Sequence, residues 1–302
     1  MLSQRPVVTI GMPLFNNAAT VAKAISALAS QSRTDFALVI SDDGSTDETA
    51  SVCADWAQRD RRIHLVRQPK NLGYLNFRYV LMRSETPFFM WAAGDDWWDS
   101  TYLARCLDAL ESDAKAVCAV SRCRFYSRGS PMQLARGTYA LQGDVKENLW
   151  RYLSAPRDNT RIYGLFRTAV AQRSFPANAF HAYDWAFAAA TLRDGTHIEV
   201  PDVLLHRDRT SPDRYVDLVH RDARSSLERV FPCLPMTSWL VRHARIPLDA
   251  RILGALVELN VEKHREYAEK YLPRYARFAD PAFSAWDRRV AWRLVARSPG
   301  DA

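Results

Sequence analysis

The first 125 residues alternate between short apolar runs and longer segments with a helical pattern. The apolar runs are continuous, which is typical of strands buried on both faces of a parallel sheet. They cover residues 7–10, 36–40, 63–66, 88–92 and 117–120. The helical segments between them cover 20–30, 45–59, 74–83 and 101–111. This repetition predicts an α/β domain in which helices cover both faces of a mostly parallel sheet.

Polar clusters follow three of these predicted strands. They are the pairs Asn16-Asn17, Asp42-Asp43 and Asp95-Asp96. Parallel sheets bind ligands in the crevice at the carboxyl ends of their strands, so we expect the three loops to converge on one pocket. Adjacent carboxylates repel each other and cannot be buried cheaply without a cation or hydrogen-bond donors. The pair Asp95-Asp96 therefore predicts a positive partner at this edge.

The composition narrows the class of protein. With 48% hydrophobic and 25% charged residues, the 302-residue chain can form one large domain, with or without an appendage. No apolar run approaches the ~20 residues that span a bilayer, and the opening MLSQRPVVTIGMP turns polar too soon for a secretory signal. The five cysteines are odd in number and lack zinc-site spacing, so reduced thiols and a cytoplasmic location are expected.

The net charge of +7 suits nucleic acid, anionic lipid or phosphorylated substrates equally well. No zinc-finger spacing, RNP-type aromatic set or lysine-rich tail is present in the sequence, so no nucleic-acid partner is expected.

The pattern loosens after residue 127. Helices are predicted over 147–153, 169–173, 184–192, 217–230, 248–271 and 282–296, and a strand over 197–205. Beyond Pro212 the chain reads as mainly helical, which places a boundary there.

Four motifs in order resemble the family 2 glycosyltransferases, whose fold is GT-A. They read VVTIGMPLFNNAATVAKAISALASQ, DFALVISDDGSTDET, NLGYLNFR and FFMWAAGDDWWD, and they cover roughly the first 110 residues. The resemblance implies a Rossmann-like, mostly parallel sheet flanked by helices, with a GT-A catalytic domain over residues 1–212 and a helical C-terminal extension over 213–302. It also implies a nucleotide-diphosphate sugar donor and a divalent cation, Mg²⁺ or Mn²⁺, which neutralises the departing diphosphate.

The resemblance assigns a role to each acid after the fourth strand. Asp95-Asp96 match the family's acidic metal-binding motif, although Ala93 stands where the first acid often lies. We expect Asp95 to face the donor's ribose or the metal, and Asp96 to ligate the metal. The alternative for Asp96 is a helix cap, which is the role we expect for Asp99 or Ser100.

Other motif residues are matched to the donor. Asp43 fits an acceptor for a base N–H, and Pro13, Phe15 and Asn16 lie where the family stacks the nucleotide base. Arg78 matches an arginine that reaches the donor's phosphate or base, and its alternative is a solvated helix arginine. For the acids at 42–43 the alternative is a turn leading into the helix, whose start the spacing of Ser45 and Glu48 predicts as a capping box.

Asp184, in HAYDWAFAAATL, is the expected catalytic base. An inverting transferase needs one carboxylate to take the proton of the acceptor hydroxyl, and family members place it at a helix start some way after the metal motif. The alternative is an acid favoured there by the helix dipole. His206 resembles a late metal or diphosphate ligand, with a structural histidine as its alternative, and Arg207 and Arg209 are expected to assist the leaving diphosphate.

The C-terminal segment bears on the acceptor. Phe283, Trp286, Val290 and Leu294 share one helical stripe, and Arg289, Arg293 and Arg297 share another. Such a helix either lies on an anionic membrane surface, at the inner face of the cell membrane, or packs on the catalytic domain. The acceptor is then a saccharide or a lipid-linked saccharide, as in cell-surface polysaccharide or glycolipid assembly.

The leading hypothesis is an inverting, metal-dependent glycosyltransferase of the hexosyl type, with a UDP-sugar as first-choice donor. The alternatives are a sugar-nucleotide pyrophosphorylase, whose glycine-rich phosphate loop GMPLFNNAAT does not supply, and an inactive nucleotide-sugar-binding protein of the same fold.

Overall fold

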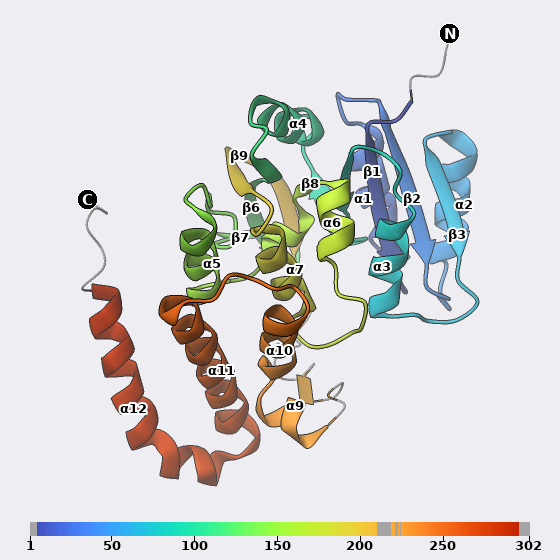
Figure 1. The fold of residues 1–302 in the computed structure, drawn as a ribbon. Helices are drawn as coiled ribbons and strands as arrows, with labels where there is room; N and C mark the ends of the chain where they lie inside the picture. The colour runs from blue at the N-terminus through green and yellow to red at the C-terminus, as the bar shows by residue number, and fades with distance from the viewer. Residues whose placement is uncertain (1–4, 210–218, 221–222, 224, 296–302) are drawn as a thin grey trace.

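The structure is a computed structural model that describes residues 5–209, 219–220, 223 and 225–295, with side chains described up to residue 285. In the described part, nine strands form one sheet with the order β3-β2-β1-β4-β8-β6-β9-β5, and β7 pairs with β6 at the side (Figure 1). The strands are β1 (Val8–Leu14), β2 (Phe36–Asp42), β3 (Ile63–Arg67), β4 (Phe88–Trp91), β5 (Trp97–Trp98), β6 (Ala116–Ser127), β7 (Ser130–Leu134), β8 (Leu165–Arg167) and β9 (Thr196–Asp208).

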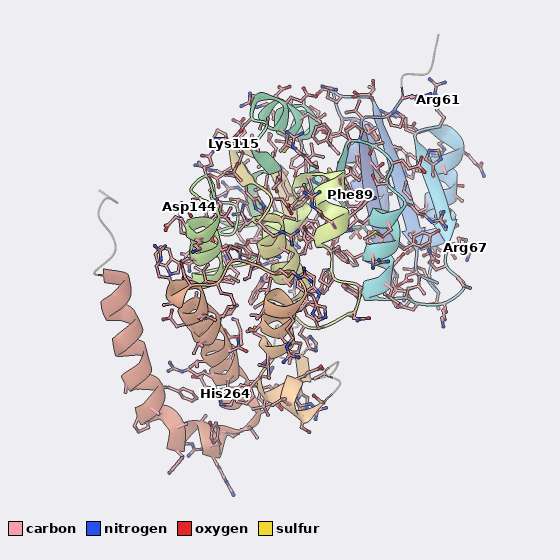
Figure 2. All side chains as sticks on the ribbon, in the orientation of Figure 1. Arg61, Arg67, Phe89, Lys115, Asp144 and His264 are labelled. Atoms are coloured by element: carbon pink, nitrogen blue, oxygen red, sulfur yellow. The ribbon has the colours of Figure 1, made fainter. Side chains whose placement is uncertain are left out.

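Two layers of helices cover the sheet. The helices of the first 200 residues are α1 (Val21–Ala29), α2 (Thr49–Arg59), α3 (Tyr74–Met82), α4 (Tyr102–Ser112), α5 (Val145–Ser154), α6 (Thr168–Ser174) and α7 (Tyr183–Thr191), with a short 3-10 turn, η1, at Thr160–Tyr163. Buried residues of α1, α2 and α4 share one core with β1, β2 and β4. Residues of α3, α6 and α7 form the core of the opposite face, where Phe89 (labelled in Figure 2) and Trp91 are fully buried.

A second group of helices extends from the sheet (Figure 1). It contains α9 (Ser226–Val230), α10 (Leu234–Arg242), α11 (Ala250–Tyr271) and α12 (Pro273–Val295). The apolar faces of α10 and α11 join α5 and α7 in a core of their own, with Leu149, Trp185, Leu240 and Leu256 among its members. Helix α7 therefore belongs to both cores and ties the helical region to the sheet.

The α/β class with a helical C-terminal region is confirmed, and the sheet is mixed. β1 pairs in parallel with β2 and β4, β2 with β3, and β6 with β9. The short strand β8 runs antiparallel between β4 and β6, and β5 runs antiparallel to β9. Strands of two or three residues carry no recognisable period, which is why the sequence did not reveal β5 or β8.

The predicted capping box at Ser45 and Glu48 is wrong. Helix α2 begins at Thr49, and Glu48 at its N-cap makes no capping hydrogen bond through its side chain. Ser45 Oγ instead accepts the Asn16 N–H at 2.9 Å. Ser45 therefore binds the loop after β1 rather than capping the helix, and α2 begins later than the motif predicts.

The predicted helix over 217–230 lies partly outside the described residues, and its described end is α9. Of the C-terminal stripe, the structure describes the side chain of Phe283, whose ring lies 6.0 Å from that of His264 on α11. The side chains of Trp286, Arg289, Val290, Arg293 and Leu294 lie outside the described ones, as does all of Arg297. None of the described helices is both long and apolar enough to cross a membrane.

All five cysteines are described, buried and free of disulfides. Burial raises the pKa of the Cys53, Cys106, Cys123 and Cys233 thiols to about 12, and that of Cys118 higher still.

Candidate active site

The three polar loops predicted to converge do meet at one edge of the sheet. The Asn17 N–H donates to Thr49 Oγ1 at 2.7 Å, and the Asp43 N–H donates to the Leu14 carbonyl at 2.8 Å. The third loop, which carries the acidic pair, packs against the first loop at Gly94. A Cβ atom placed on Gly94 would lie 2.5 Å from Leu14 Cδ2 and 3.0 Å from Asn17 Cγ. Only glycine lets the acidic loop approach the first loop this closely.

Asp43 is buried, and backbone donors bind both of its carboxylate oxygens. The Leu72 N–H donates to Oδ1 at 2.7 Å and the Gly73 N–H to Oδ2 at 2.8 Å. Asp43 thus fixes the loop before α3, which carries Arg78. Its neighbour Asp42 takes the turn role that was the alternative for this pair, with Oδ1 accepting the Ser45 N–H at 3.4 Å. Contact of Asp43 with a nucleotide base stays a prediction.

Residues after β1 form an accessible surface next to this loop. Phe15 is exposed, at 46% of its maximal area, and Asn16 is exposed with a left-handed backbone (φ +55°). Asn16 Oδ1 accepts the Thr46 N–H at 2.9 Å, which fixes the loop. Pro13 is half-buried at the end of β1. An exposed phenyl ring held on a fixed loop is suited to stacking on a planar ligand.

Arg78 is half-buried on α3, and its Nε is buried without a hydrogen-bond partner among the described residues. Buried guanidinium donors are rarely left unpaired. An anionic group of a ligand would satisfy this donor.

Asp96 is buried against Arg207, which was not foreseen as its partner. Arg207 Nε donates to Asp96 Oδ2 at 3.0 Å, and Asp96 is 1% exposed. Burial raises the pKa of Asp96 to about 6, and Arg207 acts in the opposite direction. Asp95, next to it, is exposed. The positive partner expected for the acidic pair is therefore supplied in part by the chain itself.

His206 lies across from Trp97 in the β5–β9 pairing. The two rings stack, with centroids 5.4 Å apart, and His206 Nε2 lies 3.2 Å from Asp99 Oδ1. The expectation that Asp99 or Ser100 caps α4 is wrong, since Thr101 is the N-cap and no side chain caps this helix. The Asp99 carboxylate is turned toward the histidine instead. Trp98 belongs to the core, whereas Trp97 is half-buried under Lys23, whose Nζ lies 3.0 Å from the ring centroid.

Asp184 lies in the first turn of α7, and its carboxylate is held by a chain of hydrogen bonds. Asn159 Nδ2 donates to Asp184 Oδ2 at 3.0 Å, and the Tyr152 hydroxyl donates to Asn159 Oδ1 at 2.6 Å. Burial raises the pKa of Asp184, while the Asn159 bond and Arg207 oppose the rise. A carboxylate of raised pKa, oriented by a neighbour, has the properties of a general base.

Tyr163 connects the two acidic centres. Its ring lies under the Arg207 guanidinium at 4.3 Å. Burial raises the pKa of the Tyr163 phenol to about 12, with Arg207 lowering it and Asp96, Asp95 and Asp184 raising it further. Tyr163 therefore lies beside the Arg207–Asp96 pair, and the charge of the Asp184 carboxylate also acts on its phenol.

The described residues do not build a metal site by themselves, since no three His, Cys, Asp or Glu side chains in this part of the chain form a group that could hold an ion. Ions such as Mg²⁺ at phosphate sites take one or two carboxylates and complete their shell with substrate oxygens and water. Asp96 Oδ1 is buried without a hydrogen-bond partner among the described residues and fits one such ligand. His206 Nδ1 is likewise buried without a hydrogen-bond partner among the described residues. Both roles stay predictions.

Sequence reasoning missed three members of this arrangement, Tyr152, Asn159 and Tyr163. Asn159 is 25 residues from Asp184 in sequence and has a left-handed backbone (φ +46°). The dipeptide Asp158-Asn159 is a signal for a turn, but nothing in a single sequence indicates what the turn contacts.

Comparison with known proteins gives consistent matches. Residues 9–175 match the family model described as Glycosyl transferase family 2. The uncharacterized glycosyltransferase EpsJ of Bacillus subtilis (strain 168) is 22% identical over 240 residues, which cover 72% of this chain and 65% of EpsJ. Chondroitin synthase of Escherichia coli is 26% identical over 128 residues, which cover 42% of this chain and 18% of that protein. The chain thus spans less than two thirds of the length of each relative.

A solved structure shares the fold. The crystal structure of S. aureus TarS 1-349 in complex with UDP-GlcNAc is similar with a TM-score of 0.65 at 15% identity, covering 86% of this chain and 72% of TarS 1-349. The structure of TarS 1-349 in complex with UDP is similar with a TM-score of 0.57 at 14% identity, covering 90% and 87% of the two chains.

Proposed function

Since the chain belongs to glycosyl transferase family 2 and has the GT-A fold, we propose that it is an inverting hexosyltransferase that moves a sugar from a nucleotide-diphosphate donor to an acceptor hydroxyl. The observation that carries the proposal is the half-buried Asp184, whose carboxylate Asn159 orients and whose charge, like that of Asp96, acts on Tyr163 beside Arg207. The family match favours transfer over the pyrophosphorylase alternative.

The donor is expected at the loops after β1, β2 and β4. We propose that Phe15, whose ring is exposed, stacks on the base and that Asp43 and Asp95 contact the nucleoside. Arg78 would bind a phosphate through its Nε, which has no hydrogen-bond partner among the described residues. UDP-GlcNAc in the similar TarS structure supports a UDP-sugar as the first choice. Mg²⁺ or Mn²⁺, held by Asp96 Oδ1 with His206 as a second ligand, would neutralise the diphosphate.

The transfer step assigns Asp184 the role of base. Its carboxylate accepts the proton of the acceptor hydroxyl while that oxygen bonds to the anomeric carbon, and the bond from this carbon to the diphosphate breaks on the opposite face. The nucleoside diphosphate leaves with the bonding electron pair, and the configuration inverts. Arg207 stays on Asp96 and adds positive charge near the leaving group.

The proposal is tested by nucleotide release from UDP-, dTDP- and GDP-sugars with Mg²⁺ or Mn²⁺, with and without a chelator, in the presence of saccharide or lipid-linked saccharide acceptors. We expect release with at least one donor and its loss on chelation. Donor binding without release under every acceptor would instead support an inactive nucleotide-sugar-binding protein.

Two variants separate the assigned roles. Asp184→Asn should preserve donor affinity and lower kcat by about 10²–10⁴-fold, the range of a lost general base. Asp96→Asn should weaken metal-dependent donor binding. Transfer by Asp184→Asn at the normal rate would show that another group is the base.

The acceptor is proposed to be a saccharide or a lipid-linked saccharide in cell-surface polysaccharide or glycolipid assembly, with the enzyme in the cytoplasm. Binding of α12 to an anionic membrane is proposed as its route to a lipid-linked acceptor. Sedimentation with vesicles of anionic and of neutral lipid measures this contact, and equal sedimentation with both would argue against it.

A further inference from the structure

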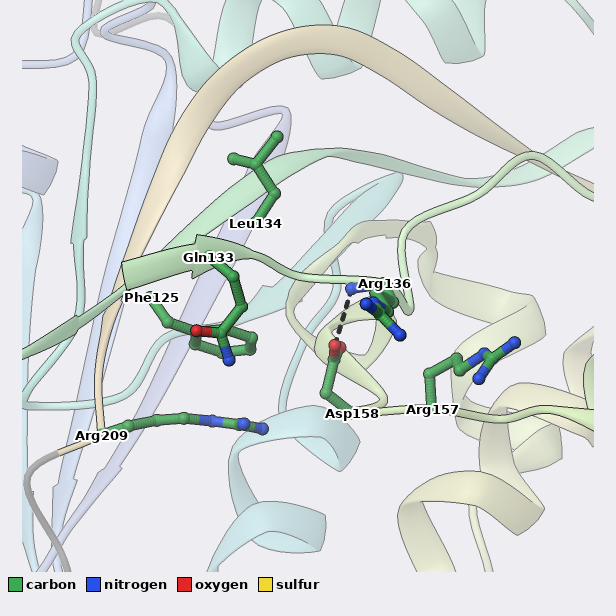
Figure 3. A pocket seen from close by; sticks show the side chains of 7 residues that line it. All are labelled: Phe125, Gln133, Leu134, Arg136, Arg157, Asp158 and Arg209. Atoms are coloured by element: carbon green, nitrogen blue, oxygen red, sulfur yellow. Dashed lines mark hydrogen bonds between the residues drawn. The ribbon is translucent and has the colours of Figure 1, made fainter. Parts of the chain in front are cut away.

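A cavity of about 500 Å³ lies beside the end of β9, and three arginines border it. The β6–β7 hairpin, the loop after α5 and the residue that follows β9 contribute its walls. Figure 3 shows Arg209 reaching in from one side, with Arg136 and Arg157 on the other. The volume is in the range of sites for small ligands, about 300–1,000 Å³.

The cavity has an excess of positive charge. The carboxylate that lines the cavity, Asp158, accepts hydrogen bonds from uncharged donors. Its Oδ2 accepts the Arg136 backbone N–H at 2.7 Å, and its Oδ1 accepts the Thr160 N–H at 3.1 Å and the Thr160 hydroxyl at 2.8 Å. In the described part of the chain, no carboxylate forms an ion pair with the guanidinium of Arg136, Arg157 or Arg209. Three guanidinium groups thus remain available to one anion.

Arg209 is held in place without being neutralised. Its guanidinium carbon lies 3.8 Å from the centroid of the Phe125 ring. Its backbone N–H donates to the Tyr126 carbonyl at 2.8 Å, which continues the pairing of β9 with β6. A cation–π contact of this kind holds a guanidinium in position and leaves its positive charge without a counter-ion.

The loop after α5 links the cavity to the proposed base. Arg157 and Asn159 both have left-handed backbones, with φ of +58° and +46°. Arg157 lines the cavity, and two residues later Asn159 donates to Asp184 Oδ2 at 3.0 Å. Strain of this kind is retained where the surrounding structure fixes the conformation, often at functional sites.

Strand β9 links the cavity to the acidic pair in the same way. Arg207 holds Asp96, and Arg209 follows two residues later. Residues two apart in an extended chain point to the same side, and the charge of Arg207 acts on the Arg209 guanidinium. Two lining residues of the cavity are thus two positions along the chain from the residues that hold the base and the acidic pair, yet no residue of β1, β2 or the loop 93–96 lines it.

We propose that this cavity binds a negatively charged group of the acceptor, a phosphate or a carboxylate, and that the enzyme accordingly glycosylates an acidic glycan. The inference rests on the proposed function and names its acceptor class. Guanidinium forks bind both groups in bidentate fashion. The donor diphosphate, which Arg209 was expected to assist, is a poor alternative occupant, because the loops that should bind the nucleotide do not reach the cavity walls.

The test measures glycan binding apart from catalysis. The full chain is applied, in the presence of excess UDP, to immobilised oligosaccharides in three matched sets: neutral, uronate-bearing and phosphate-bearing. We expect binding to one acidic set at least about tenfold tighter than to the neutral set. The variant Arg136→Gln/Arg157→Gln/Arg209→Gln should lose this preference. The two acidic sets distinguish a carboxylate from a phosphate.

The control is Arg59→Gln/Arg61→Gln/Arg83→Gln, which removes the same number of charges from exposed positions away from the cavity (Arg61 is labelled in Figure 2). It should bind acidic glycans within about twofold of the unchanged protein. Equal loss in both triple variants would attribute binding to overall charge and overturn the proposal, as would equal binding of neutral and acidic sets. If the cavity variant does not fold, each single variant carries the test, with a partial loss expected.

The two proposals fail in different ways. Selective acidic-glycan binding without nucleotide release from any sugar donor would overturn the proposed function alone. Transfer to neutral and acidic acceptors at equal kcat/KM, unchanged in the cavity variant, would overturn this inference alone.

Discussion

At the scale of single residues, Asn159 sets the orientation and the acidity of Asp184. It donates to Asp184 Oδ2 and accepts from the hydroxyl of Tyr152, which lies on α5. One side chain thus links α5 to the Asp184 carboxylate by two hydrogen bonds. A hydrogen bond to the carboxylate favours the charged form and opposes the rise in the Asp184 pKa caused by burial. Asn159 is a positioning residue in this arrangement.

The variant Asn159→Gly tests this role while keeping the left-handed backbone that glycine adopts without strain. We expect kcat to fall by about tenfold, less than on loss of the base itself, with the donor KM unchanged. The acid limb of the kcat profile should move to higher pH, because the carboxylate loses a donor that stabilises its charge. Tyr152→Phe, which leaves the Asn159–Asp184 bond in place, should shift the limb less. A lower kcat with an unmoved acid limb would contradict the role.

At the scale of elements, the approach of the loop 93–96 to β1 depends on Gly94. A Cβ atom there would meet Leu14 Cδ2 at 2.5 Å and Asn17 Cβ at 3.1 Å, so the two loops must separate. Since Asp95 and Asp96 follow directly, the acidic pair must move with them.

We expect Gly94→Ala to lower the free energy of unfolding by about 1–3 kcal/mol through overpacking and to weaken binding of the sugar nucleotide. The matched control is Gly254→Ala in α11, where an added Cβ meets no atom within 4 Å. Alanine in the helix interior should raise the free energy of unfolding by up to about 1 kcal/mol. Urea unfolding and nucleotide titration measure both effects. Unchanged donor affinity in Gly94→Ala would separate this loop from the donor site.

The same scale shows what the sequence could reveal. The strand at Phe36 was recognisable because its apolar run is continuous and is followed by a polar turn, and the acids after β2 and β4 were recognisable because carboxylates rarely end buried strands. Their partners were not recognisable. Arg207 meets Asp96 across 111 residues, and β8 enters the sheet as three residues whose direction is set by tertiary packing rather than by a local pattern.

At the scale of the whole molecule, a buried histidine couples stability to pH. His197 is fully buried: its Nδ1 lies 3.3 Å from Arg161 Nη1, and its Nε2 lies 3.0 Å from Thr191 Oγ1. Thr191 Oγ1 donates to the Ala188 carbonyl, so His197 Nε2–H donates to it and Nδ1 accepts from Arg161. Burial and the arginine hold the pKa of His197 well below its ordinary value.

Below pH about 6.5 the unfolded chain therefore binds a proton at this histidine that the folded chain does not. We expect His197 to reduce the free energy of unfolding as pH falls from about 7 to 5, by up to about 1.4 kcal/mol per pH unit. His197→Gln should flatten this dependence, whereas His64→Gln, at an exposed position, should leave it as it is. Equal slopes in the three proteins, from urea unfolding at each pH, would count against the assignment.

The five buried cysteines give the whole molecule a practical property. Thiol reagents attack the thiolate, and here burial both removes access and holds each thiol in its protonated form at neutral pH. A single cysteine introduced at an exposed position, such as Gln133→Cys on the rim of the arginine cavity, would then be the one reactive thiol of the chain. A fluorophore attached there would report on arriving glycans without any of the native cysteines having to be removed.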